Sequence, residues 1–177
     1  MRRLRAGLVL AALGAGLAGG PARAATGAEC VVAMAGADTA ARVDFETGLA
    51  ALVAQVAPEQ AGLAAMSRDV QVLLAEDRLD RLTYLAEVKP HLFRGEAGAI
   101  DWTAQDEASY IAAPGHAERM ERISALGQTL EADPGRAALQ ELFATVITRL
   151  FEFQKLMVDH NAARKAAADA FTACRDG

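Results

Sequence analysis

The chain has 177 residues, of which 53% are hydrophobic, and its 18 basic and 23 acidic residues give a formal net charge of −5. This length suits one domain with a continuous core. Scattered and outnumbered Lys and Arg argue against nucleic acid as a partner, because phosphate backbones are bound by clustered basic side chains. The same charge argues against anionic membrane surfaces.

The first 24 residues have the pattern of an export signal. Three arginines within the first five residues precede an apolar run over 7–17, and Ala22 and Ala24 are the small residues that a signal peptidase reads. The run is short and is followed by Pro21, so a permanent membrane span is disfavoured. We expect cleavage after Ala24 and a single helical-bundle domain over 25–177, located in the periplasm or secreted.

Cleavage would make the protein more acidic. The segment 1–24 holds four of the 18 basic residues and none of the 23 acidic residues, so the mature chain would carry a net charge of −9. The larger negative charge of the exported form argues more strongly against nucleic acid as a partner.

A long apolar stripe marks the end of the chain. Asp133 is a favourable N-cap, Pro134 suits the first helical position, and the sequence predicts one helix over 134–174. Residues at alternating steps of four and three share one side of this helix: Leu139, Phe143, Val146, Leu150, Phe153, Met157, His160, Arg164, Ala167, Phe171 and Cys174. A rod of roughly 60 Å needs other long antiparallel helices to cover it.

Three further helices are predicted before it. Apolar periodicity and proline stops place them at 39–56, 58–89 and 116–132, although 58–89 is equally consistent with two collinear pieces. The small residues of 25–36 suggest a partly ordered lead-in. The fold class is therefore all-α: an antiparallel bundle of three to four long helices, with 90–115 as a cross-connection at one end.

The cross-connection is the compositional break of the chain, rich in glycine and proline. Asp101 or Thr103 can cap a short helix over about 102–112. In the favoured interpretation, Trp102 and Tyr110 dock this helix on the bundle end. The alternative is a recognition loop that presents Trp102, Tyr110 and Asp106 to a partner.

The two cysteines, Cys30 and Cys174, are predicted to form one disulfide. An exported protein meets an oxidising compartment, and no other cysteine competes for either partner. The absence of Cys-x-x-Cys and Cys-x-x-Cys-His excludes a thioredoxin-type site and a c-type haem attachment. A lipid anchor on Cys30 is a weaker alternative, because Glu29 stands where a lipoprotein signal needs a small neutral residue.

Two histidine and methionine pairs have spacings that suit a metal or haem. His116 and Met120 lie four residues apart, and His160 lies on the apolar stripe one turn from Met157. The favoured interpretation makes His116 an exposed residue near a helix start, Met120 a core residue and His160 a hydrogen-bonded histidine. We therefore expect no cofactor and no metal.

No catalytic motif is found in the sequence, which holds no His-Glu-x-x-His, no Gly-x-Ser-x-Gly and no phosphate-binding glycine loop. The sequence predicts an exported, non-enzymatic bundle that binds a protein partner, as a chaperone, adaptor or sensor accessory. The alternative is a metal- or haem-binding periplasmic bundle. The sequence leaves the oligomeric state and the partner open.

Overall fold

The computed structural model describes residues 26–93, 103–113 and 115–176, apart from the side chain of Leu92. The predicted export signal, Asp101 and Trp102 lie outside these residues. Every regular element in the described ranges is helical, which confirms the all-α prediction for this part of the chain. The α-helices are α1 (Gly27–Val56), α2 (Ala61–Val88), α3 (Ala104–Ile111), α4 (His116–Ala132), α5 (Arg136–Thr145) and α6 (Phe151–Asp176).

Three short 3-10 turns connect these helices. They are η1 (Pro58–Gln60), η2 (Pro90–Phe93) and η3 (Ile147–Arg149). The prolines at the first position of η1 and η2 stop the preceding helix, because proline cannot donate the backbone hydrogen bond that would continue it. The helix α2 is continuous, so the open choice between one helix and two is decided in favour of one.

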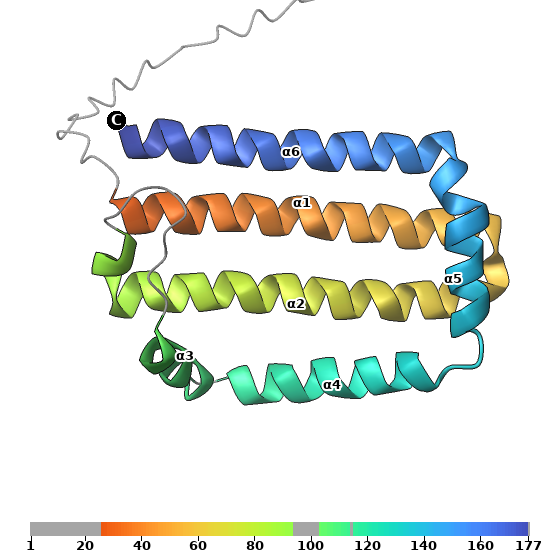
Figure 1. Cartoon of the computed structure of the whole chain (residues 1–177), viewed down its shortest axis with the longest axis horizontal. Coiled ribbons are helices and arrows are strands. Elements are labelled where there is room, and N and C mark those ends of the chain that lie inside the picture. Colours follow the sequence, from red (N-terminus) through yellow and green to blue (C-terminus); the bar gives the residue numbers. More distant parts are fainter. Residues whose placement is uncertain (1–25, 94–102, 114, 177) are drawn as a thin grey trace, which may run out of the picture.

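The long helices lie side by side in a row. Figure 1 shows the order α6, α1, α2, α4, with consecutive helices α1 and α2 running in opposite directions. The main contacts follow the same order, since α1 packs on α2 and α6, while α4 packs on α2. The helix α5 crosses one end of the row, and α3 lies at the other end (Figure 1). The described helices thus form an open layer with two broad faces.

The predicted start of the first helix is wrong. The helix begins at Gly27 rather than at residue 39, because Thr26 and Glu29 form a capping box. The Thr26 hydroxyl accepts a hydrogen bond from the Glu29 amide at 3.3 Å, and the Glu29 carboxylate accepts one from the Thr26 amide at 2.6 Å. The segment predicted as a partly ordered lead-in is therefore the first part of α1.

The predicted last helix is also wrong, because it is divided. The Asp133 carboxylate accepts a hydrogen bond from the Gly135 amide at 2.7 Å and begins a turn, after which α5 ends at Thr145. The four β-branched residues 145–148 have low helix propensity, and Leu150 is extended with φ −74° and ψ 142°. The break lets α5 cross the layer while α6 returns along α1.

The predictions for the remaining helices are closer. The helix α4 has the predicted bounds, 116–132. The short helix predicted over about 102–112 is α3, and Thr103 caps it through a second capping box with Asp106.

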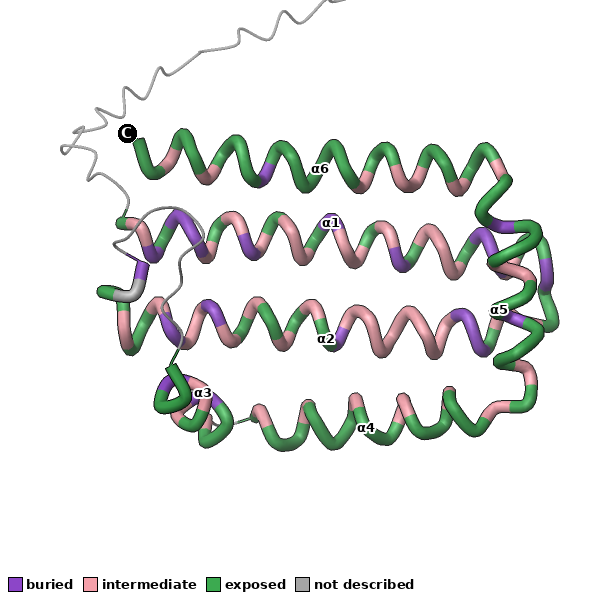
Figure 2. The backbone as a smooth tube through the Cα atoms, in the orientation of Figure 1, coloured by how far each residue is buried: buried purple, intermediate pink, exposed green. Residues whose placement is uncertain are grey.

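The core is divided into two clusters at opposite ends of the layer (Figure 2). The Leu85 core consists of Ala28, Val31, Ala35, Leu82, Leu85 and Phe93, with Phe171 of α6 packed against it. The Val53 core consists of Leu52, Val53, Leu63, Ala64, Leu139 and Ile147. Between the two clusters, polar side chains of α1, α2 and α6 gather along one groove, which is the site described below.

The predicted disulfide between Cys30 and Cys174 is confirmed. The two Cα atoms are 5.7 Å apart, within the usual range for a bridge. Cys30 lies in the first turns of α1 rather than in a flexible segment, so the bridge joins two helices directly. None of the helices in the described residues has an apolar stretch long enough to span a bilayer.

Reduction of the bridge should lower the melting temperature while leaving the helical signal intact, because the two cores rest on apolar packing. A chain-entropy estimate for a loop closed over 144 residues gives an upper bound of about 4–5 kcal/mol. Circular-dichroism melts with and without reductant measure the effect, and the double variant Cys30→Ser, Cys174→Ser is the control for the reductant itself. An unchanged melt after verified reduction would contradict this prediction.

The break before α6 predicts unequal effects on stability for two neighbouring apolar residues. Ile147 is fully buried in the Val53 core, whereas Phe151 is 76% exposed. We expect Ile147→Ala to lower the free energy of unfolding by about 2–5 kcal/mol through the cavity it leaves. We expect Phe151→Ala to change it by less than about 0.5 kcal/mol. Urea unfolding of both variants tests the prediction, and equal effects would show that the break is misplaced.

Candidate functional site

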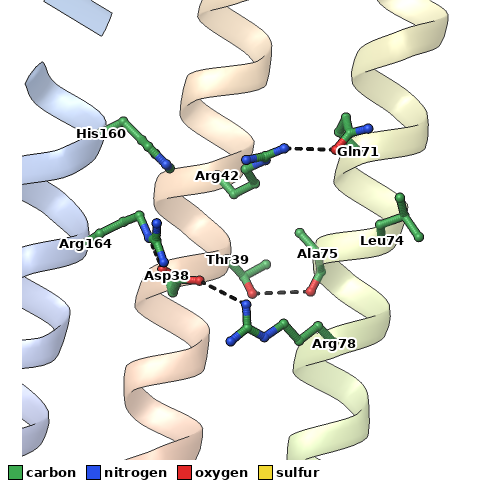
Figure 3. A pocket seen from close by; sticks show the side chains of 9 residues that line it. All are labelled: Asp38, Thr39, Arg42, Gln71, Leu74, Ala75, Arg78, His160 and Arg164. Atoms are coloured by element: carbon green, nitrogen blue, oxygen red, sulfur yellow. Dashed lines mark hydrogen bonds and ion pairs between the residues drawn. The ribbon is translucent and has the colours of Figure 1, made fainter. Parts of the chain in front are cut away.

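A polar groove lies between the two cores, where α1, α2 and α6 come together (Figure 3). We call it the central arginine groove. Its cavity has a volume of about 290 Å³. The residues that line it are Asp38, Thr39 and Arg42 of α1, Gln71, Leu74, Ala75 and Arg78 of α2, and His160 and Arg164 of α6.

Helical spacing brings these residues to one groove. Asp38 and Arg42 are four apart on α1, Gln71 and Ala75 are four apart on α2, and His160 and Arg164 are four apart on α6. Residues at this spacing lie on the same side of a helix. Adjacent turns of each helix therefore contribute to the groove, and Arg78 extends the contribution of α2 by one further turn.

Asp38 is shared between two arginines of different helices. Its Oδ1 accepts a hydrogen bond from Arg164 Nε at 2.6 Å, while its Oδ2 lies 4.0 Å from Arg78 Nη1. The side chains of Arg164 and Arg78 are 53% and 72% exposed. Both guanidinium groups thus remain accessible from the groove while one carboxylate faces them (Figure 3).

Arg42 is held more firmly. Its Nε lies 2.9 Å from Glu46 Oε1, and its Nη2 donates a hydrogen bond to Gln71 Oε1 at 2.9 Å. Glu46 is only 7% exposed. Burial raises the pKa of Glu46, and the nearby charges of Arg42 and His160 reduce this rise without cancelling it.

His160 is fixed by the backbone and by an aromatic neighbour. Its Nδ1 lies 3.1 Å from the carbonyl oxygen of Ala41 and, facing an acceptor, carries the hydrogen and donates it. Its ring centroid lies 4.9 Å from that of Phe45. The prediction of a hydrogen-bonded His160 is confirmed. Thr39 makes a further link across the groove, donating to the Ala75 carbonyl at 3.4 Å.

The groove has an excess of positive charge. Its arginines Arg42, Arg78 and Arg164 share two carboxylates, those of Glu46 and Asp38. This excess is local, because the whole chain has a net charge of −5. Planar guanidinium groups bind the oxygens of carboxylates and phosphates through paired hydrogen bonds, so the groove has the chemistry to hold either group.

A second polar cluster, the Asp77 cluster, joins α2 to α3 and α4. The Tyr110 hydroxyl donates to Asp77 Oδ1 at 2.7 Å, and Arg119 Nη1 lies 3.1 Å from the same oxygen. Arg119 also pairs with Asp80. His116 Nδ1 lies 3.3 Å from Asp77 Oδ1, and its ring meets the edge of the Tyr110 ring. The cluster attaches the two short helices to the layer.

The pKa values of the Asp77 cluster reflect these contacts. Burial alone would raise the pKa of Asp77, but hydrogen bonds from Tyr110 and Arg119, together with the charges of His116 and Arg119, hold it below its ordinary value of 3.8. The pKa of Tyr110 is raised, first by burial and then by its hydrogen bond to the Asp77 carboxylate. A lowered pKa of Asp77 and a raised pKa of Tyr110 are expected when an ionised carboxylate accepts a hydrogen bond from a protonated phenol.

The structure places the predicted metal pairs in other surroundings. His116 is largely buried against Asp77 and Tyr110, and Met120 is 39% exposed, so the predicted exposure of His116 and burial of Met120 are both wrong. Met157 is half-buried on α6. In the described ranges, no three His, Cys, Asp or Glu side chains converge as metal ligands.

Two of the three residues of the predicted recognition loop are buried by packing. Tyr110 is held in the Asp77 cluster, and the buried Asp106 pairs with Lys89 and accepts from the Thr103 hydroxyl at 2.7 Å. These contacts fix α3 to the end of α2. Trp102 lies outside the described residues, so recognition through that segment stays a prediction.

Sequence reasoning missed the central arginine groove. The helical spacing places Arg164 on the apolar stripe beside His160, the charged run around Arg78 indicates a solvated outer face, and nothing in the sequence marks Arg42 as a site residue. The available signal was the occurrence of polar residues at stripe positions, such as Arg164, in the middle of a long helix. Comparison of the chain with protein-family models, curated proteins and solved structures finds no match.

The Asp77 cluster predicts a pH-dependent loss of stability. A carboxyl group whose pKa is depressed by folding stabilises the protein above its unfolded pKa, and this contribution disappears as the pH falls through the folded value. Asp77→Asn should therefore lower the free energy of unfolding at pH 7 by about 1–3 kcal/mol, because a neutral amide oxygen replaces the charged acceptor shared by Tyr110 and Arg119. The difference from the wild type should shrink as the pH falls below 3.8.

Urea unfolding across this pH range measures both effects. The matched control is Asp169→Asn, since the Asp169 side chain is exposed and, among the described residues, pairs only with Lys165 of the same helix. A difference between wild type and Asp77→Asn that stays constant with pH would contradict the assignment.

Proposed function

We propose that this chain is an exported, non-enzymatic binding protein that contacts a protein partner through the central arginine groove. The observation that supports this is the convergence of Arg42 of α1, Arg78 of α2 and Arg164 of α6 on one open cavity. Charged residues brought together in the middle of a helical layer cost packing, so their presence favours a binding role.

The geometry of the groove favours binding over catalysis. The Asp38 carboxylate is held by guanidinium groups, and the His160 imidazole donates to a backbone carbonyl. A general acid or base needs a group that is free to exchange a proton with a substrate. The groove residues are instead arranged as fixed charges and hydrogen-bond donors.

Export is the second part of the proposal. The bridge between Cys30 and Cys174 is typical of oxidising compartments, and it supports a location in the periplasm or outside the cell. The export signal predicted at residues 1–24 supports the same location. We further propose that α1, α2, α4 and α6 work as an antiparallel bundle, with the 90–115 segment crossing one end and the groove left open for the partner.

Partner capture with a groove variant tests the proposal. Immobilised mature protein should retain a stoichiometric partner from native envelope extract. The variant Arg78→Glu, Arg164→Glu should retain at least about tenfold less of this partner, because the charge of the groove is reversed. Lys165→Glu is the matched control, because Lys165 is an exposed cation of α6 outside the groove.

Two results would contradict the proposal. Equal capture by the groove variant and the control would show that the groove is not the contact surface. An absorption spectrum or elemental analysis that revealed a stoichiometric haem or metal in the protein would favour the alternative of a metal- or haem-binding bundle instead.

A further inference from the structure

We propose that the central arginine groove recognises carboxylate groups of an acidic peptide segment, and that Asp38 occupies the carboxylate position until the peptide displaces it. This inference rests on the proposed function and deepens it by naming the chemistry of the partner. It depends on three features of the groove: the internal carboxylate, the accessible donors and the neutral rim.

Asp38 shows which chemistry the groove accepts. One of its oxygens accepts from Arg164 Nε at 2.6 Å, and the other faces Arg78 Nη1 at 4.0 Å. A single carboxylate thus lies between guanidinium groups of α2 and α6. A carboxylate from another molecule would meet the same two groups, because planar guanidinium donors match carboxylate oxygens in pairs.

The two arginines keep donor capacity beyond Asp38. Each guanidinium has five N–H donors. The contact of Arg78 with Asp38 is longer than a hydrogen bond, and in the described ranges it is the one charged contact of that side chain. Arg164 engages Asp38 through Nε, at one edge of its guanidinium. A ligand carboxylate can therefore bind before Asp38 has fully moved away.

Arg42 supplies a fixed charge rather than a mobile one. Glu46 and Gln71 hold its guanidinium on both sides at 2.9 Å. It therefore keeps the groove positive without collapsing onto Asp38. Arg42 is thus anchored, while Arg78 and Arg164 are accessible. Two accessible arginines allow the carboxylate of Asp38 to be exchanged for a carboxylate of the peptide.

The rim favours a peptide over a free inorganic anion. The rim consists of the exposed Leu74 and of the neutral polar residues Thr39 and Gln71, which also line the groove. An apolar side chain next to paired donors suits a chain that carries both methylene and carboxylate groups, such as glutamate. A phosphate ion would contact the guanidinium groups but would make no contact with the side chains of the rim.

Calorimetric titration of the mature protein at low ionic strength tests the inference. The probes are a hexaglutamate peptide, a hexaglutamine peptide of the same length and inorganic phosphate. We expect binding of hexaglutamate, no binding of hexaglutamine, and weaker binding of phosphate. Arg78→Gln and Arg164→Gln should each weaken hexaglutamate binding about fivefold, and Asp38→Asn should strengthen it about fivefold, the scale of a partly exposed ion pair.

Matched controls keep the result interpretable. Lys165→Gln removes an exposed cation from α6 outside the groove and should leave hexaglutamate affinity unchanged. Arg78 is largely exposed, so Arg78→Gln should leave the melting temperature unchanged and keep the test independent of folding. Equal weakening by Lys165→Gln and Arg78→Gln would overturn the inference, because binding would then follow overall charge.

Two further outcomes overturn it. An Asp38→Asn variant that binds hexaglutamate no more tightly than the wild type would show that Asp38 does not occupy the ligand position. Phosphate that binds as tightly as hexaglutamate would show a general anion site rather than a site for acidic peptides.

The two proposals can fail separately. If the captured partner depends on the groove but hexaglutamate does not compete for it, the carboxylate inference fails and the proposed function stands. If hexaglutamate binds as expected but no partner is captured, the site assignment stands and the proposed function fails.

Discussion

The attachment of α6 to α1 is the constraint on which the rest of the structure depends. Ala167 is the one residue of α6 that is buried in the described part of the chain, so this helix has little core of its own. It is secured at its ends by the bridge from Cys174 to Cys30 and by the Val53 core near its start, and at its middle by the hydrogen bonds of His160 to Ala41 and of Arg164 to Asp38. Because α6 carries His160 and Arg164, these end attachments also determine one side of the central arginine groove.

The division of the core explains why a polar site can exist in the middle of long helices. Apolar packing at the Leu85 and Val53 cores stabilises both ends of the α1 and α2 pair, so the centre need not be apolar. The cost of this arrangement is visible at Glu46, where burial raises the pKa of the carboxyl group. Arg42 offsets part of that cost and is itself fixed by the contact, which links the electrostatics of the core to the geometry of the groove.

The Asp77 cluster and the central arginine groove differ in kind. In the Asp77 cluster the donors Tyr110 and Arg119 converge on one partly buried carboxylate, and their hydrogen bonds hold the pKa of Asp77 below its ordinary value against the effect of burial. Such a cluster is structural, because the Asp77 carboxylate, the Tyr110 hydroxyl and the Arg119 guanidinium are engaged with one another. In the central arginine groove one carboxylate is divided between two exposed guanidinium groups, one of them beyond hydrogen-bond distance. The incomplete pairing of that groove is the feature that supports a ligand.

The sequence by itself determined the helical class, the pairing of Cys30 with Cys174 and the helix 116–132, because local periodicity, proline stops and the presence of only two cysteines suffice for them. It did not determine where α1 begins or where the last helix breaks, since a capping box at Thr26 and a β-branched run at 145–148 compete with a longer apolar pattern. The central arginine groove was decided only by tertiary structure. Arg42, Arg78 and Arg164 are 36 and 86 residues apart in sequence, and they meet because the bridge and the two cores set the register of three helices.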